Sequence, residues 1–157
     1  MAKTPTKLRI LFVDKMNDVT SQLAEYFTRK MFGDRYDVFS AGPEHDIIDC
    51  ELISVMYQRG DDMRRQTSKD FRDQETLPAD AKFDLVIYLD REVFDEWSTK
   101  TPWKGIQIYV DMPSTRAFDA TDDAELFQCY MGLIGKIEGW VKESMGDVES
   151  LRPMVTA

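Results

Sequence analysis

Short apolar runs alternate with longer amphipathic stretches along this chain. Four of these runs are rich in β-branched and aromatic residues and are too short for helices, which is typical of buried strands in a parallel sheet. The predicted strands are residues 8–13, 36–41, 83–89 and 105–110. Because helical patterns separate these strands, the sequence predicts an α/β layered fold.

The segments between the runs carry apolar residues at helical spacing. They predict one helix that ends near Gly33, a second over residues 47–57, and a third that begins at Arg91. A long amphipathic helix should begin at Thr121, where a hydroxyl and several carboxylates suit the positive end of the helix dipole, and continue to Val141.

Three glycines share one face of this last helix, namely Gly132, Gly135 and Gly139. A glycine inside a helix costs roughly 1 kcal/mol relative to alanine. We therefore expect this face to approach the sheet or another chain closely.

Length and composition are those of one globular domain. The chain has 157 residues, of which 43% are hydrophobic and 31% charged. We expect a single domain over residues 1–145 and a loosely held tail over residues 146–157.

The sequence contains neither an apolar stretch of membrane length nor the apolar core of a signal peptide, so the expected location is the cytoplasm. A net charge of -9 argues against binding to nucleic acid or to anionic membranes.

The thiols and the single imidazole do not form a recognisable motif. Cys50 and Cys129 lack the spacing of a metal site or a redox pair, so we expect two reduced, partly buried thiols. We expect the only histidine, His45, to be a solvated loop residue.

Acidic residues follow three of the predicted strands. They are Asp14, Asp90 and Asp111, and Gly42 follows the remaining strand. Because binding sites in open parallel sheets form outside the carboxyl ends of the strands, we expect the functional site at this edge.

The loop after the first strand begins a series of motifs. Asn17 and Ser21 follow Asp14 at fixed spacing, and Ala24-Glu25 comes shortly afterwards. Further motifs are Ser-Ala-Gly at 40–42, a basic, hydroxyl-containing turn within 60–71, and an Asp-Leu strand that ends in Asp at 83–90. In this order and spacing, from about residue 8 to residue 141, the chain resembles the low-molecular-weight protein tyrosine phosphatases and the arsenate reductases of the same fold. The resemblance implies a Rossmann-like three-layer sandwich with a four-stranded parallel sheet of order 2-1-3-4 and helices on both faces.

The chain departs from the family pattern at the positions that carry its chemistry. The resemblance places Asp14 at the position of the nucleophilic cysteine and Thr20 at that of the phosphate-binding arginine. It places Met16 at a loop glycine, and Met112, next to Pro113, at the general acid. The whole degenerate phosphate loop is Asp14, Lys15, Met16, Asn17, Asp18, Val19, Thr20 and Ser21.

These departures predict a pseudophosphatase without cysteine-dependent phosphatase or arsenate reductase activity. Two carboxylates in the loop should repel an oxyanion, because like charges about 4 Å apart repel by roughly 4 kcal/mol at an effective dielectric of 20. The chain would then serve as a binding or regulatory module with a protein partner, no nucleic acid or membrane partner and no cofactor, and with a homodimer as an alternative.

Two other interpretations of the carboxylates stay open. Asp14, Asp90 and Asp111 can converge on Mg²⁺ in a metal-dependent phosphatase, or Asp14 can be a phosphoacceptor. Alternatively, Asp14 accepts N–H bonds from its own loop, Asp90 caps the helix that begins at residue 91, and Asp111 fixes its own turn. The basic residues Arg59, Arg64, Arg65 and Lys69 are a candidate surface for an acidic partner.

Overall fold

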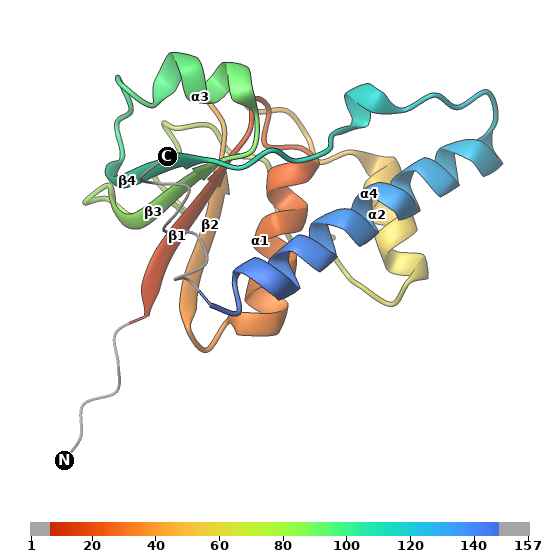
Figure 1. The fold of residues 1–157 in the computed structure, drawn as a ribbon, viewed down its shortest axis with the longest axis horizontal. Coiled ribbons are helices and arrows are strands. Elements are labelled where there is room, and N and C mark those ends of the chain that lie inside the picture. The colour runs from red at the N-terminus through yellow and green to blue at the C-terminus, as the bar shows by residue number, and fades with distance from the viewer. Residues whose placement is uncertain (1–6, 148–157) are drawn as a thin grey trace.

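Four parallel strands form the sheet that positions the site. The computed structural model describes residues 7–147, so most of the predicted tail over 146–157 and the N-terminal segment considered for a signal peptide lie outside the described residues. The strands are β1 (Leu8–Val13), β2 (Tyr36–Ala41), β3 (Lys82–Tyr88) and β4 (Lys104–Tyr109). Their order is β2-β1-β3-β4, which confirms the predicted topology (Figure 1).

Helices cover both faces of the sheet (Figure 1). They are α1 (Thr20–Phe32), α2 (Cys50–Gln58), α3 (Arg91–Trp97) and α4 (Asp123–Ser144), with a short 3₁₀ turn at Thr115–Ala117. Each boundary lies within about three residues of its prediction. The long helix begins after Asp122, whose side chain caps it, rather than at Thr121.

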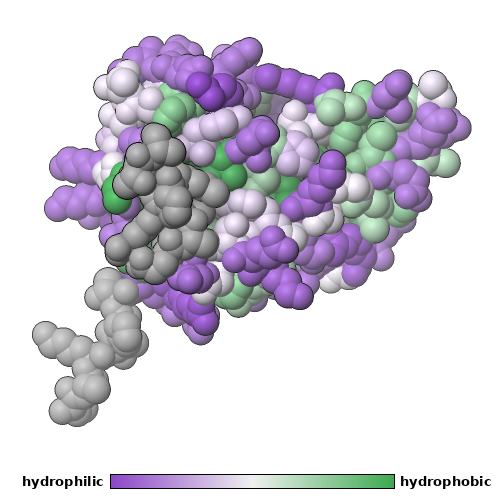
Figure 2. All heavy atoms as spheres, in the orientation of Figure 1, coloured by the Kyte–Doolittle hydropathy of each residue, from purple (hydrophilic) through white to green (hydrophobic). Residues whose placement is uncertain are grey.

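Alternating side chains divide the core of the sheet into two layers. In β1, Ile10 and Phe12 pack with α1, α2 and α4, whereas Leu11 and Val13 pack with α3 and the segment that precedes β3. These four side chains, at the carboxyl end of β1, are fully buried. Figure 2 shows hydrophilic residues over most of the face in view, with hydrophobic residues in smaller groups among them.

The glycine face of α4 does not approach the sheet, so that part of the prediction is wrong, whereas a close approach to another chain stays a prediction. A Cβ atom added at Gly132, Gly135 or Gly139 would meet nothing within 4 Å. The helix packs through its apolar side, where Leu133 and Ile137 are buried. No helix among residues 7–147 combines the length and the apolar character needed to cross a membrane.

Candidate functional site

The register of the sheet brings the end of β1 beside the ends of its neighbours. Val13 pairs with Ala41 on one side and with Tyr88 on the other. The loop over residues 14–19 therefore leaves the sheet at its carboxyl edge and leads directly into α1. This is the edge at which the sequence predicted the site.

A hollow of about 150 Å³ lies at this edge, and we call it the site hollow. Its walls come from the loop after β1, from the end of β3 and from the turn before α4. The lining residues are Asp14, Lys15, Met16, Asp18, Val19, Thr20, Leu89, Asp90, Ser114, Thr115 and Arg116.

The Asp14 carboxylate is buried against the N-terminus of α1. Its Oδ1 accepts a hydrogen bond from the Asn17 backbone N–H (2.7 Å), and its Oδ2 accepts one from the Ser21 backbone N–H (2.8 Å). The residue that precedes α1, Val19, has no capping side chain. Asp14 therefore places a negative charge at the positive end of the helix dipole, and the expectation that it accepts N–H bonds from its loop is confirmed.

Burial changes the acidity of this carboxyl. Loss of solvent raises the pKa of Asp14 to about 6, although the hydrogen bonds from Ser21 and Asn17 act in the opposite direction. The neighbouring charge of Asp18 raises it a little further, and burial also raises the pKa of Asp18 itself, with Asp46 and Asp49 contributing. The pKa of Asp14 therefore lies about one unit below neutral pH, so the carboxyl is mostly ionised there and its protonated form is still accessible.

Asn17 holds the loop in shape. Its φ of 51° lies in the left-handed region, which asparagine tolerates better than most residues. Its fully buried side chain donates to Ser21 Oγ (2.8 Å) and accepts from Gln22 Nε2 (2.9 Å) and from the Lys69 backbone N–H (2.8 Å). The tight curvature of the loop thus falls on Asn17, and Met16 has no positive φ.

Thr20 and the segment around Pro113 close the other side of the hollow. The Thr20 hydroxyl donates to the Pro113 carbonyl (3.1 Å), which ties the start of α1 to the turn before α4. Met112 packs against the hydrophobic core. Asp111 is exposed, does not line the site hollow, and accepts a hydrogen bond from the Tyr109 hydroxyl (3.1 Å).

Arg116 is a cation of the site hollow that the sequence pattern did not predict. Its Nη2 lies 3.4 Å from Asp90 Oδ2, so the pair spans the hollow from the turn to the end of β3. Asp90 also caps α3 by accepting the Val93 N–H (3.2 Å), as predicted. The only sequence signal for Arg116 was a basic residue three positions after Pro113.

The expected convergence of the three carboxylates on a metal is not found. Asp14 is bound to its own loop, Asp90 to α3 and Arg116, and Asp111 to Tyr109. No group of three or more metal-ligating side chains occurs within residues 7–147.

The remaining candidates lie apart from the site hollow. His45 is half exposed, but it is not simply solvated, because its Nδ1 lies 2.7 Å from Asp70 Oδ2. Cys50 is exposed and Cys129 is half-buried, and neither lines the hollow.

The four basic residues do not form one surface. Arg59 binds both carboxylate oxygens of Glu138 (3.0 Å each), and Arg64 binds Asp62. Lys69 is buried.

Comparison with known proteins finds relatives that are named arsenate reductase. The chain is 40% identical over 80 residues to an arsenate reductase of Halalkalibacterium halodurans, and this match covers 51% of the chain and 55% of that protein. It is 33% identical over 97 residues to an arsenate reductase of Bacillus licheniformis, which covers 62% of the chain and 67% of that protein. The chain thus spans little more than half the length of the first relative.

These relatives overturn the functional prediction from the sequence. The prediction of a pseudophosphatase that is not an enzyme, and in particular not an arsenate reductase, is wrong, since the curated relatives are arsenate reductases. The prediction rested on single positions of one loop, whereas the similarity to the arsenate reductases extends over 51% to 62% of the chain.

The fold and the family model agree with the motifs that the sequence suggested. A low molecular weight protein tyrosine phosphatase from T. tengcongensis superposes with a TM-score of 0.66 at 18% identity, covering 89% of this chain and 99% of that one. The model of the low molecular weight phosphotyrosine protein phosphatases matches residues 9–119, which is more than half of the chain. The chain therefore belongs to the low molecular weight phosphotyrosine protein phosphatase family.

Proposed function

We propose that the chain is an enzyme that promotes nucleophilic attack on a tetrahedral oxyanion, arsenate or a phosphate monoester, in the site hollow. The observation that carries the proposal is Asp14, a buried carboxyl with a pKa raised to about 6 at the N-terminus of a helix. An acid–base group is most effective when its pKa lies near the working pH. Family membership and the arsenate reductase relatives support the oxyanion as the substrate class.

Two cations are available to hold the oxyanion. Lys15 and Arg116 both line the hollow, and the ion pair of Arg116 with Asp90 (3.4 Å) must open for the oxyanion, while the loop amides of Asn17 and Ser21 are already bonded to Asp14. We therefore place the oxyanion in the outer part of the hollow, between these cations. The Asp14 carboxylate accepts two backbone N–H groups and a side-chain hydrogen bond from Ser21, so about one of its four acceptor positions is left for a proton from the reacting group.

The attacking group in this proposal comes from outside the chain, since no cysteine lines the hollow. For a phosphate monoester, a water oxygen bonds to phosphorus and the ester P–O bond breaks, while Asp14 accepts the water proton and the alcohol leaves with a proton from solvent. For arsenate, an external thiol loses its proton to solvent and its sulfur bonds to arsenic, while the As–O bond breaks and hydroxide leaves as water with the proton of neutral Asp14. A second external thiol, also deprotonated by solvent, then attacks that sulfur and the As–S bond breaks, which releases a disulfide and, with the electron pair left on arsenic, arsenite, and Asp14 regains its proton from solvent.

Asp14→Asn should lower either activity by about 100-fold, the lower end of what a positioned acid–base group contributes. The purified protein is assayed for arsenate reduction with dithiothreitol or thioredoxin, and for hydrolysis of para-nitrophenyl phosphate. Asp95→Asn, at an exposed position on α3, is the matched control and should retain activity. Absence of both activities in the wild type, or equal activity in Asp14→Asn, would refute the proposal.

A further inference from the structure

A second hollow, of about 210 Å³, lies beside α1 and β2, and we call it the Lys69 hollow. It shares no residue with the site hollow. Its lining residues are Glu25, Arg29, Val38, Phe39, Arg65, Gln66, Thr67, Lys69 and Thr76. Three of these side chains are cationic and one is anionic, which gives a net charge of +2 on a chain whose total charge is -9.

The central cation, Lys69, is buried and has unused donors. Its side chain is 9% exposed, and its Nζ donates to the Thr67 carbonyl (2.7 Å). Glu25 lies 3.8 Å away, which is beyond hydrogen-bond distance. An ammonium has three N–H donors, so two of them have no hydrogen-bond partner among the described residues. Burial lowers the pKa of Lys69, as expected for a charge with too few partners.

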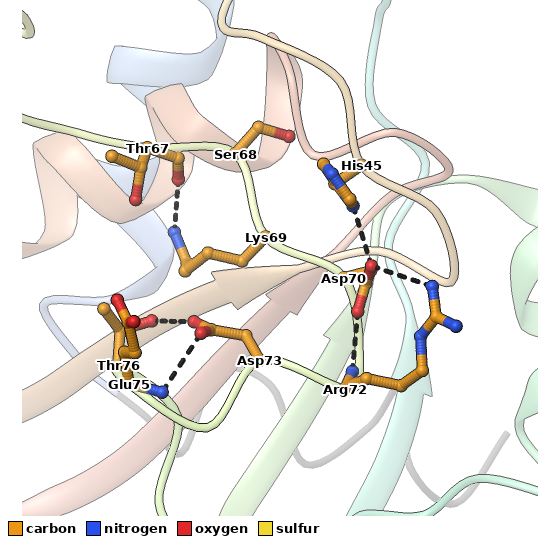
Figure 3. Close-up of a pocket in the computed structure, with 9 residues that line it drawn as sticks. All are labelled: His45, Thr67, Ser68, Lys69, Asp70, Arg72, Asp73, Glu75 and Thr76. Carbon is orange, nitrogen blue, oxygen red and sulfur yellow. Dashed lines mark hydrogen bonds and ion pairs between the residues drawn. The ribbon is translucent and has the colours of Figure 1, made fainter.

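Lys69 also borders the larger neighbouring hollow that contains the histidine. Figure 3 shows its side chain extending away from Asp70 and towards Thr67, at the opposite end from His45 and Arg72. Asp70 is already shared between His45 (2.7 Å) and Arg72 (3.3 Å). The lysine ammonium therefore has no hydrogen bond to Asp70, and the charge of Asp73, which also borders that hollow, interacts with it only through space.

The two arginines of the Lys69 hollow have donors left for a ligand. Arg29 donates to Glu25 (3.2 Å) and to the Val38 carbonyl (2.8 Å), which uses two of its five N–H groups. Arg65 is exposed and has no hydrogen bond or ion pair with any residue between 7 and 147. The neighbouring carboxylate of Asp62 is held by Arg64 instead, through two bonds of 2.9 Å.

We propose that the Lys69 hollow is a binding site for a small divalent oxyanion such as phosphate, held by Lys69, Arg65 and Arg29. Guanidinium groups and an ammonium together offer the charge-assisted hydrogen bonds that oxyanions prefer. A dianion would neutralise the net charge of the hollow and supply the missing acceptors of the buried ammonium. This site does not depend on the proposed enzymatic function.

The Lys69 hollow is connected to the loop over residues 14–19 through the Lys69 backbone N–H, which donates to Asn17 Oδ1 (2.8 Å), and through the buried Gln22 side chain. Gln22 donates to Thr67 O (2.9 Å) and to Asn17 Oδ1 (2.9 Å), and it accepts from Gln66 (2.7 Å). An oxyanion bound at Lys69 would therefore hold the segment that supports Asn17.

Isothermal titration calorimetry with inorganic phosphate tests the site, with sulfate and acetate as comparison anions. Phosphate and sulfate should bind, and acetate at least tenfold more weakly because it has a single charge. Arg65→Gln should weaken phosphate binding at least tenfold without unfolding the protein, since the side chain is exposed. Arg72→Gln, on the same segment but outside the hollow, is the matched control and should bind as the wild type does.

Amide chemical shifts distinguish this site from the site hollow. Phosphate should shift the amides of residues 65–69 in the wild type and in Asp14→Asn, whatever the catalytic outcome of that variant. Shifts confined to residues 14–20, or phosphate binding that Arg65→Gln leaves unchanged, would overturn the assignment. Equal binding of acetate and phosphate would exclude a site for dianions.

Discussion

The free energy of unfolding should fall by about 3 kcal/mol as the pH rises from about 4 to above 6, because of Asp14 alone. In the folded protein its pKa is raised from 3.8 to about 6. Between these values the folded state keeps a proton that the unfolded state has lost, so stability decreases with rising pH. Below about pH 4 both states are protonated, and the unfavourable burial of the charge is absent.

Asp14→Asn should remove this slope, since an amide does not titrate. Only the change of the free energy of unfolding with pH is informative, and its absolute value is not. The reason is that the asparagine NH₂ group replaces one of the two oxygens that accept the loop N–H groups, which changes stability at every pH. Urea unfolding at several pH values between 4 and 7 measures this slope, and the shift of Asp18 acts in the same direction but remains in the variant. Asp95→Asn serves as the control and should keep the slope of the wild type. An unchanged slope in Asp14→Asn would mean that Asp14 is not the buried titrating group.

Gly42→Ala should destabilise the protein by about 3 kcal/mol, the upper part of the usual range for overpacking. A Cβ atom at this position would lie 2.5 Å from the carbonyl oxygen of Asp14, 2.6 Å from that of Lys15 and 2.8 Å from that of Glu44. All three are backbone atoms, so no side-chain rotation relieves the clash. The backbone of the loop over residues 14–19 must move instead, and any activity should fall together with stability.

Gly135→Ala on α4 is the matched control for Gly42→Ala, because the added methyl group would lie in open space. No atom lies within 4 Å of the added Cβ, so the variant should gain about 1 kcal/mol from the helix preference of alanine. Denaturant midpoints of both variants and the wild type provide the comparison. A Gly42→Ala protein as stable as the wild type would show that Gly42 does not lie against the backbone of Asp14 and Lys15.

Similarity to the family was visible in motifs that shape the backbone. Asn17 supplies a left-handed residue, Gly42 allows the close approach of two loops, and Ser21 accepts from Asn17 at the start of α1. These requirements are local, so they appear as fixed residue types at fixed spacing. The cytoplasmic location, a protein partner and self-association stay predictions from the sequence.

The sequence by itself determined the strands, the helices and the edge of the sheet where the site forms, because hydrophobic periodicity and the parallel arrangement follow from local pattern. Only the tertiary structure decided what the charged residues do. It buries Asp14 and Lys69, brings Arg116 to Asp90, and separates Asp111 from the site hollow. The reason is physical: the pKa and the partners of a charged group depend on burial and on neighbours that are distant in sequence, and no local pattern records them.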